Sequence, residues 1–225
     1  MSTQKLIAFD LDGTLVDSRR DLADSANQLI EEMGGAPLAE EAIGRMVGEG
    51  AGLLVRRAVT AAGLTCTDAA LPRFLEIYDT RMLNFTHPYA GVVDAVMAAR
   101  DHARVVVLTN KPLAPSLRIL DAFELRHLFE DVVGGDNPLG RKPEPAALEQ
   151  LMRDAGATAA ATLLVGDSAI DHETARRAGV QCCLVAFGFG FLNLPPDRLR
   201  PGDWIARDAG ELTGMVARFV ATRTG

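Results

Sequence analysis

The chain has 225 residues, of which 48% are hydrophobic and 24% are charged, which allows one large domain or a core domain with a smaller one. Its formal net charge of −7 excludes a surface built to attract nucleic acid or an anionic membrane. The three cysteines give no disulfide framework, and we find neither a signal peptide nor an apolar run of the roughly 20 residues that a membrane span needs. We therefore expect a soluble cytoplasmic protein.

Short apolar runs alternate with helical patterns along most of the chain. Continuous apolar runs are typical of strands that are buried on both faces. On this basis we predict strands at 6–9, 104–108, 132–133, 162–165 and 182–185. Helices are predicted at 91–102, 113–125, 144–156, 168–178 and 209–222. Strands separated by single helices favour right-handed βαβ units, so the predicted fold class is α/β with a doubly wound parallel sheet.

The stretch from 16 to 84 has no convincing strand pattern. Its first helix ends at Gly34-Gly35 and has one apolar face, formed by Leu22, Ala26, Leu29, Ile30 and Met33. Further helices are predicted at 39–47, 51–62 and 68–84. A helical insert directly after the first strand cannot join the sheet. We therefore expect a small α-helical cap domain, 16–85, over one edge of a core domain formed by 1–15 and 86–225.

Polar residues stand where the predicted strands end or where the following helices begin. They are, in chain order, Asp10, Asp12, Thr109, Asn110, Lys142, Asp167 and Asp171. Each alone has an ordinary explanation as a turn residue, a helix N-cap or a surface lysine. In an open parallel sheet, however, ligands bind beyond the carboxyl ends of the strands. We therefore expect these side chains to converge at one edge of the sheet.

The residue types in this set indicate phosphate chemistry. Asp10 and Asp12 are two residues apart, so an extended chain would aim them to the same side. With Asp167 they favour Mg²⁺, a hard cation that prefers oxygen ligands, and no His/Cys cluster with zinc spacing is found. Thr109 can donate its hydroxyl to a phosphate oxygen, and Lys142 supplies a positive charge. Such groups would offset the repulsion between an attacking carboxylate and a phosphate.

Four segments in this order resemble the motifs of the haloacid dehalogenase (HAD) superfamily. They are Asp10-Leu11-Asp12-Gly13-Thr14, Thr109-Asn110, Lys142-Pro143 and Gly166-Asp167-Ser168-Ala169-Ile170-Asp171. The resemblance covers essentially the whole chain and implies a Rossmann-like core with a helical cap. Three further segments resemble the phosphoglycolate phosphatase branch: Thr109-Asn110-Lys111-Pro112, Gly134-Gly135-Asp136 and Phe187-Gly188-Phe189-Gly190.

The resemblance implies a Mg²⁺-dependent phosphomonoester hydrolase that acts through an aspartyl-phosphate. Asp10 matches the nucleophile and Asp12 the general acid and base. Asp10, the backbone carbonyl of Asp12, and Asp167 would hold Mg²⁺. Asp171 would orient a metal-bound water or Lys142 from outside the set of metal ligands.

Substrate contacts are implied in both domains. Thr109 and Lys142 would bind the transferring phosphate, with support from Asn110. In the cap, Gly48-Glu49-Gly50 and Arg45 lie where family members place a substrate-specificity loop. Glu49 departs from the pattern, because relatives often carry a neutral polar residue there. The expected substrate is 2-phosphoglycolate, whose carboxylate would bind Arg45 and the backbone amides around Gly48 and Gly50.

Other functions remain open on the sequence alone. A β-phosphoglucomutase-like phosphomutase or another small-molecule HAD phosphatase would share the motifs and the cap. A haloacid dehalogenase needs neither Asp12 nor Asp167, and a receiver-type signalling domain lacks an inserted cap. The expected partner is a small phosphorylated metabolite, and the chain is expected to be a monomer or a homodimer. We interpret the remaining distinctive residues as core, loop or surface positions: His87, His102, His127, His172, Cys182, Cys183 and Trp204.

Overall fold

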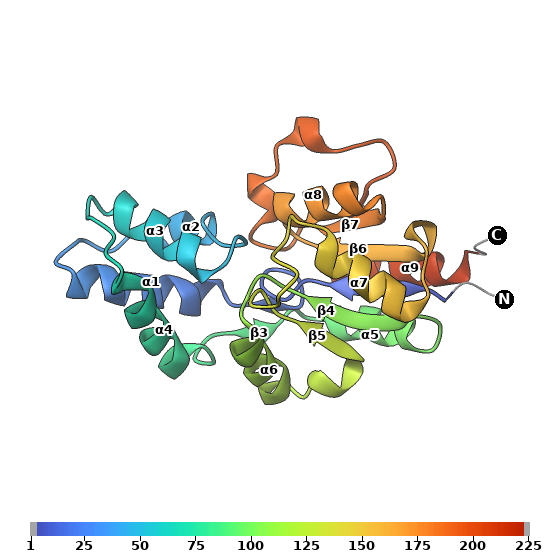
Figure 1. Cartoon of the computed structure of the whole chain (residues 1–225), viewed down its shortest axis with the longest axis horizontal. Helices are drawn as coiled ribbons and strands as arrows, with labels where there is room; N and C mark the ends of the chain where they lie inside the picture. The colour runs from blue at the N-terminus through green and yellow to red at the C-terminus, as the bar shows by residue number, and fades with distance from the viewer. Residues whose placement is uncertain (1–3, 223–225) are drawn as a thin grey trace.

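A parallel sheet forms the centre of the molecule in the computed structural model, which describes residues 4–222 (Figure 1). Within these residues, six parallel strands lie in the order β5-β4-β1-β6-β7-β8. Their bounds are β1 Leu6–Phe9, β4 Arg104–Leu108, β5 Asp131–Val133, β6 Thr162–Gly166, β7 Gln181–Val185 and β8 Trp204–Ala206. The expected α/β class with a doubly wound parallel sheet is confirmed.

Alternate residues of strands β1, β4, β6 and β7 enter two separate hydrophobic cores. In β1, Ile7 and Phe9 belong to one core, whereas Leu6 and Ala8 belong to the other. This follows from the two-residue period of a strand, whose successive side chains point to opposite faces. All four residues have no exposed surface, which explains why the strand is a continuous apolar run.

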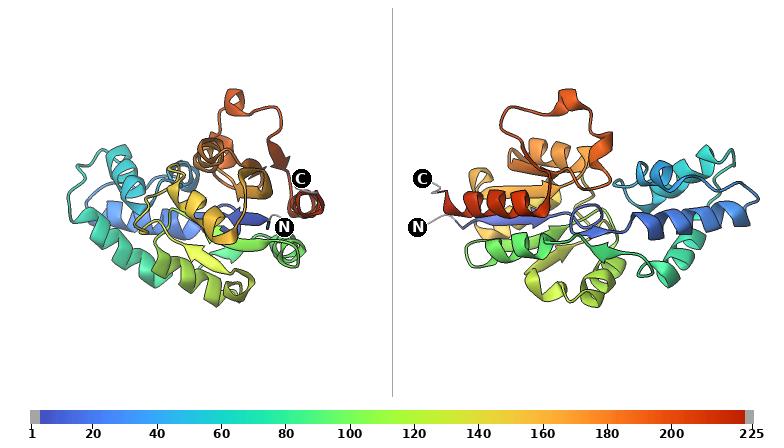
Figure 2. Two further views of the ribbon diagram at one scale, coloured as in Figure 1. Left: turned by 45° about the vertical axis from the view of Figure 1, so that its right-hand side comes forward. Right: turned by 180° about the vertical axis from the view of Figure 1, so that it is seen from behind.

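Helices cover both faces of the sheet. Buried apolar residues of α5 and α9 belong to the core that contains Phe9, and those of α7, together with Ala175 of α8, belong to the core that contains Ala8. Figure 2 shows α5 and α9 side by side on one face of the sheet. The helices of this part of the chain are α5 Val92–Arg100, α6 Leu113–Ala122, α7 Ala146–Ala155, α8 Ala169–Ala178 and α9 Ala209–Ala221.

The helices between β2 and β3 form a separate group beyond the carboxyl ends of the strands (Figure 1). They are α1 Arg19–Glu32, α2 Glu40–Gly44, α3 Ala51–Ala61 and α4 Ala70–Arg81. The predicted apolar face of α1 packs inward, with Leu22, Leu29 and Ile30 buried. Asn110 and Arg118 of the core contact this group through hydrogen bonds to the Gly48 carbonyl and to Asp79.

Two short strands mark where the chain leaves and re-enters the core. β2 (Val16–Asp17) pairs antiparallel with β3 (His87–Pro88). The carboxylate of Asp21, which is fully buried, accepts hydrogen bonds from Phe85 N and Thr86 N and fixes the returning chain to α1. We retain the division into a core of 1–15 and 86–225 and a cap of 16–85 as a proposal, which the position of this strand pair supports.

Several local predictions were wrong. Trp204 packs against the core as expected, but the strand that it begins, β8, was not predicted, because three residues are too few to show a pattern. Similarly, β2 is a two-residue strand inside the stretch expected to have none. The helix predicted at 39–47 ends at Gly44, which makes α2 only five residues long. Of the helices in the described part of the chain, none is long and apolar enough to cross a membrane.

Candidate active site

Three buried carboxylates meet at the carboxyl ends of β1 and β6. Oxygen atoms of Asp10, Asp167 and Asp171 all lie within 4.8 Å of one another. The Lys142 ammonium lies between two of them, with Nζ 2.9 Å from Asp10 Oδ1 and 2.6 Å from Asp171 Oδ1. Because Asp10 Oδ1 also accepts the Leu11 N–H at 2.7 Å, one oxygen of the nucleophile candidate is fixed in place.

The charges in this cluster balance only when protons or a further cation neutralise the carboxylates. Three carboxylates and one ammonium leave two negative charges in a site shielded from water. Burial raises the pKa of Asp10 from 3.8 to about 7, although Lys142 opposes the shift. Burial, followed by the charges of Asp171 and Asp10, also raises the pKa of Asp167 well above its ordinary value. A divalent cation that prefers carboxylate oxygens would neutralise the cluster, so these residues fit Mg²⁺.

Glycines surround Asp167 because no side chain has room there. Gly13 has a φ of +84°, and a Cβ at this position would lie 2.0 Å from Asp167 Oδ2. A Cβ at Gly188 would lie 2.3 Å from Asp167 Cβ, and the Gly190 N–H donates to Asp167 Oδ2 at 2.7 Å. The segment 187–190 was noted in the sequence only because it resembles a loop of related phosphatases. In the structure it fixes the orientation of the Asp167 carboxylate.

The N-terminus of α8 positions Asp171. Ser168 is the N-cap of this helix, and its side chain and that of Asp171 form a reciprocal capping box. Asp171 Oδ2 accepts from Ser168 Oγ at 2.6 Å, which leaves Oδ1 to bind Lys142. Ser168 thus caps the helix, and the same hydrogen bonds orient Asp171 towards the site.

Asp12 has a different set of partners from Asp10. Its carboxylate oxygens both lie 3.1 Å from Lys111 Nζ, and Oδ1 also accepts from Ser18 Oγ at 2.6 Å. Burial lowers the pKa of Lys111, but Asp12 and Tyr78 more than offset this, so it is raised above its ordinary value. The Asp12 carboxylate is therefore held beside a charged lysine, outside the carboxylate cluster around Asp10.

Thr109 and Asn110 follow β4 and are both buried. Asn110 Nδ2 donates to the Lys142 carbonyl at 2.9 Å and to the Gly48 carbonyl at 2.8 Å. Asn110 thereby fixes the loop that carries Lys142 and also connects it to the cap. The Thr109 hydroxyl accepts from Lys111 N at 3.2 Å and lines the same cavity as Asp10.

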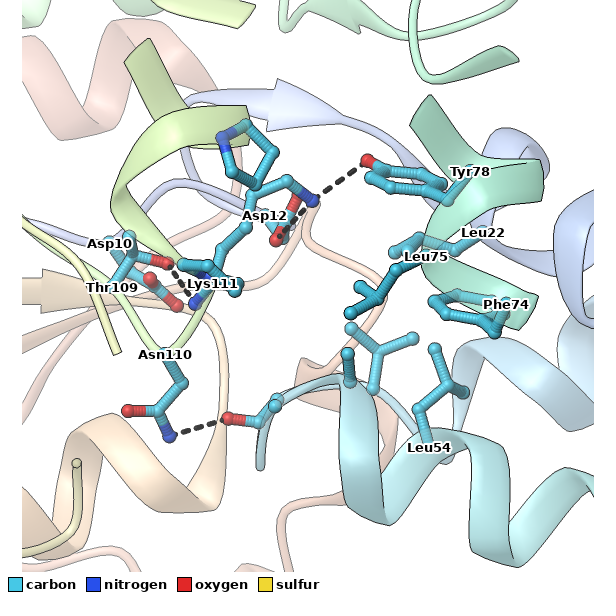
Figure 3. A pocket seen from close by; sticks show the side chains of 16 residues that line it. Asp10, Asp12, Leu22, Leu54, Phe74, Leu75, Tyr78, Thr109, Asn110 and Lys111 are labelled. Atoms are coloured by element: carbon cyan, nitrogen blue, oxygen red, sulfur yellow. Dashed lines mark hydrogen bonds and ion pairs between the residues drawn. The ribbon is translucent and has the colours of Figure 1, made fainter. Parts of the chain in front are cut away.

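The cavity in front of Asp10 lies between the core and the cap (Figure 3). Asp10, Asp12, Thr109, Asn110 and Lys111 form its core side. The cap side is mainly apolar and includes Leu22, Val47, Ala51, Leu54, Phe74, Leu75 and Tyr78. The cavity therefore has charged groups at the reaction centre and an apolar wall opposite them.

The predicted cap contacts reach this cavity only in part. Gly48 and Gly50 line it, whereas the exposed Arg45 stands at the end of α2 and is not among the lining residues. Glu49, the residue that departs from the family pattern, forms an ion pair with Arg57. The charge of Glu49 is therefore paired with a cation of the same group of helices.

Lys111, Tyr78 and Ser18 are the site residues that sequence reasoning missed. Lys111 stood inside a motif that carried the resemblance, but nothing in its local pattern indicated a partner. Tyr78 lies in α4, where helical spacing marks its face as buried and does not say what it contacts. His172, expected to be structural, pairs with Asp203 at 2.8 Å, and Cys182 and Cys183 are buried in β7 as expected.

The chain thus combines a doubly wound sheet, an inserted group of helices and an aspartate-lysine cluster at the carboxyl edge of the sheet, an arrangement that places it in the class of α/β proteins. The model of the family described as haloacid dehalogenase-like hydrolase matches residues 7–185, and the chain belongs to this family. It is 42% identical over 219 residues to a phosphoglycolate phosphatase of Rhodospirillum rubrum, covering 89% of this chain and 90% of that protein.

Two further relatives extend the comparison. A phosphoglycolate phosphatase of Pseudomonas putida is 38% identical over 193 residues, which cover 82% of this chain and 70% of that protein. Among solved structures, a predicted phosphoglycolate phosphatase from Haemophilus somnus superposes with a TM-score of 0.86 at 31% identity. That superposition covers 96% of this chain and 99% of the other.

Proposed function

We propose that this protein is a Mg²⁺-dependent phosphatase that converts 2-phosphoglycolate to glycolate and phosphate through an aspartyl-phosphate on Asp10. The observation that carries the proposal is the position of Asp10. It ends a buried strand, faces a cavity and has only Oδ1 fixed, by Lys142 and Leu11 N. Its other carboxylate oxygen has no hydrogen-bond partner among the described residues, which leaves it available for attack.

In the first half of the reaction, Asp10 attacks the phosphorus atom of the ester. A bond forms between Asp10 Oδ and phosphorus while the bond from phosphorus to the ester oxygen breaks. Asp12 enters this step protonated and gives its proton to the departing alkoxide, which leaves it as a carboxylate for the second half. Lys142 and the Thr109 hydroxyl stabilise the oxygens of the transferring group. Asn110 holds the Lys142 loop in place through the Lys142 carbonyl.

In the second half, Asp12 removes a proton from a water molecule as that water attacks the phosphorus of the aspartyl-phosphate. The bond to Asp10 breaks, and free phosphate and the Asp10 carboxylate result. Asp10, the Asp12 backbone carbonyl and Asp167 would hold Mg²⁺, with Asp171 positioning Lys142. When bound, Mg²⁺ supplies positive charge that offsets the repulsion between the phosphate and the carboxylates.

The substrate is supported by the relatives, several of which are named phosphoglycolate phosphatase, and by the position of the cap over the cavity. A cap over the reaction centre favours small esters over nucleic acid or phosphoprotein. We further propose a cytoplasmic location for a monomer or homodimer. The three free cysteines, two of them buried, support a reducing compartment.

The test is a phosphate-release screen of a few dozen phosphomonoesters with and without Mg²⁺. We expect 2-phosphoglycolate to give the highest kcat/KM and excess chelator to abolish release. A sugar phosphate that is isomerised without free phosphate would instead identify a phosphomutase. A nucleoside monophosphate or sugar phosphate as the best substrate would reject phosphoglycolate and leave the phosphatase mechanism standing.

A further inference from the structure

Lys111 is the cation available to a leaving group in the cavity. Among the described residues that line the cavity, Lys111 alone carries a positive charge. Its Nζ is equally far from both oxygens of Asp12, at 3.1 Å, which is longer than the 2.7–2.9 Å of a strong charge-assisted hydrogen bond. The ammonium has three acceptors, the two Asp12 oxygens and the Tyr78 hydroxyl, so a carboxylate of the substrate would bind by replacing one of the two longer contacts to Asp12.

Tyr78 supplies a second donor beside Lys111. Its hydroxyl oxygen accepts from Lys111 Nζ at 2.7 Å, and no acceptor for the hydroxyl proton is found in the described part of the chain. Burial raises the pKa of Tyr78 to about 12, so the hydroxyl keeps that proton at neutral pH. Figure 3 shows the Tyr78 hydroxyl pointing from the cap towards Lys111 and Asp12.

Apart from Tyr78, the described cap side chains that line the cavity are apolar, and the only other polar groups on this wall are backbone groups, including those of Gly48 and Gly50 at the start of α3. Leu54, Phe74 and Leu75 face the cavity beside Tyr78, and Phe74 stacks on Tyr78 with ring centroids 5.9 Å apart. An anionic group placed against this wall without a cation would be strongly unfavourable. Among the described side chains that line the cavity, Lys111 and Tyr78 therefore form the one place where a cation and a hydroxyl donor could meet an anion on the leaving group.

We propose that Lys111 and Tyr78 together bind a carboxylate carried by the leaving group and so determine the specificity of the enzyme. The proposal rests on the proposed phosphatase function, and it replaces Arg45 as the residue that binds this carboxylate. One member of the pair comes from the core loop after β4 and the other from α4 of the cap. The carboxylate is thus bound at the boundary between the two domains, next to Asp12.

The experiment compares two esters of the same size that differ in charge. The first is 2-phosphoglycolate and the second is carbamoylmethyl phosphate, its neutral amide. The measured quantity is the ratio of kcat/KM for the acid to kcat/KM for the amide. Because Lys111 also contacts Asp12, Lys111→Met will slow the hydrolysis of both esters. A loss that acts through Asp12 affects both esters equally and therefore cancels in the ratio.

The variants are Lys111→Met, Tyr78→Phe and Arg45→Ala, with Tyr89→Phe as a matched control. Tyr89→Phe also removes one tyrosine hydroxyl, but Tyr89 packs on Phe187 and does not line the cavity. We expect Lys111→Met to lower the ratio by about 10- to 100-fold, the usual effect of losing a hydrogen bond to a charged group. Tyr78→Phe should lower it by about 3- to 10-fold, and Tyr89→Phe should leave it unchanged.

Two outcomes would overturn the proposal. If the wild-type enzyme hydrolyses both esters equally well, no carboxylate subsite exists, although metal-dependent phosphate release would still support the phosphatase. If the wild type prefers the acid and only Arg45→Ala removes that preference, the carboxylate is bound in the cap loop. The proposed substrate would then stand, and Lys111 and Tyr78 would not determine specificity.

Discussion

Replacing Asp10 by Asn tests both the chemistry and the electrostatics of the carboxylate cluster. The amide keeps the volume of the side chain and loses the nucleophilic oxygen. We expect phosphate release from 2-phosphoglycolate to fall by at least about 1,000-fold, as is usual when the group that forms the covalent intermediate is removed. We expect the fold to remain intact, because Asn is neutral in a site where charge is costly.

The same substitution should stabilise the metal-free protein. The pKa of Asp10 is raised from 3.8 to about 7, and a shift of about three units corresponds to about 4 kcal/mol. Because the folded pKa lies above the unfolded one, the stability that Asp10 contributes is present below pH 4 and is lost as the pH rises to 7. Asn has no such dependence. The free energy of unfolding of the metal-free variant should therefore exceed that of the wild type by up to about 4 kcal/mol at pH 8. This difference should shrink towards zero near pH 4.

The assay is urea unfolding in excess chelator at pH 8 and pH 5, with Asp121→Asn on the exposed surface of α6 as a control. The control should change the free energy of unfolding by no more than about 0.5 kcal/mol. Added Mg²⁺ should stabilise the wild type more than Asp10→Asn. A variant that is less stable than the wild type at pH 8 would refute the electrostatic reasoning, and one that keeps substantial activity would refute the assignment of the nucleophile.

Three further substitutions test the neighbouring groups. Asp12→Asn should slow hydrolysis of an alkyl phosphate more than that of an activated aryl phosphate, because an acidic leaving group needs little protonation. Parallel kinetics with both esters measure this difference. Asp167→Ala should raise the Mg²⁺ concentration for half-maximal activity by at least about tenfold, and Ca²⁺ should replace Mg²⁺ poorly in the wild type. Gly13→Ala should weaken Mg²⁺ binding and lower stability, because its Cβ would lie 2.0 Å from Asp167 Oδ2; calorimetric titration and thermal unfolding measure both effects.

Each of these three predictions would be contradicted by a specific result. Equal losses with alkyl and aryl esters would exclude Asp12 as the proton donor. An unchanged Mg²⁺ requirement in Asp167→Ala would exclude Asp167 as a ligand. Wild-type metal affinity in Gly13→Ala would mean that Asp167 can shift without consequence for the site.

The order of the polar motifs was sufficient to predict where the carboxylate cluster forms. Asp10 follows an apolar run and Asp167 follows another, and parallel strands place their carboxyl ends at one edge of the sheet. The pairing of β1 with β6, with Phe9 opposite Val165, brings these two residues together. Local sequence therefore predicts this part of the site, because the period of a strand and the rules of strand connection leave few arrangements.

The apolar face of α1 was predictable for a similar reason. Leu22, Ala26, Leu29 and Ile30 recur at helical spacing, and all four are buried. In contrast, β8 and β2 have three and two residues, and such short strands exist because a neighbouring strand pairs with them. Cys183 pairs with Trp204 across β7 and β8, a contact that no local pattern around Trp204 predicts.

The sequence by itself determined the α/β class, the inserted helical cap and the acidic residues at the strand ends, because each depends on local periodicity and chain order. Only the tertiary structure decided which lysine pairs with which carboxylate. Lys142 pairs with Asp10 and Asp171, whereas Lys111 lies between Asp12 and Tyr78. Lys111 is 99 residues from Asp12 and 33 from Tyr78 in the chain. Contacts of this kind depend on how the cap packs on the core, and helical or strand periodicity carries no information about that packing.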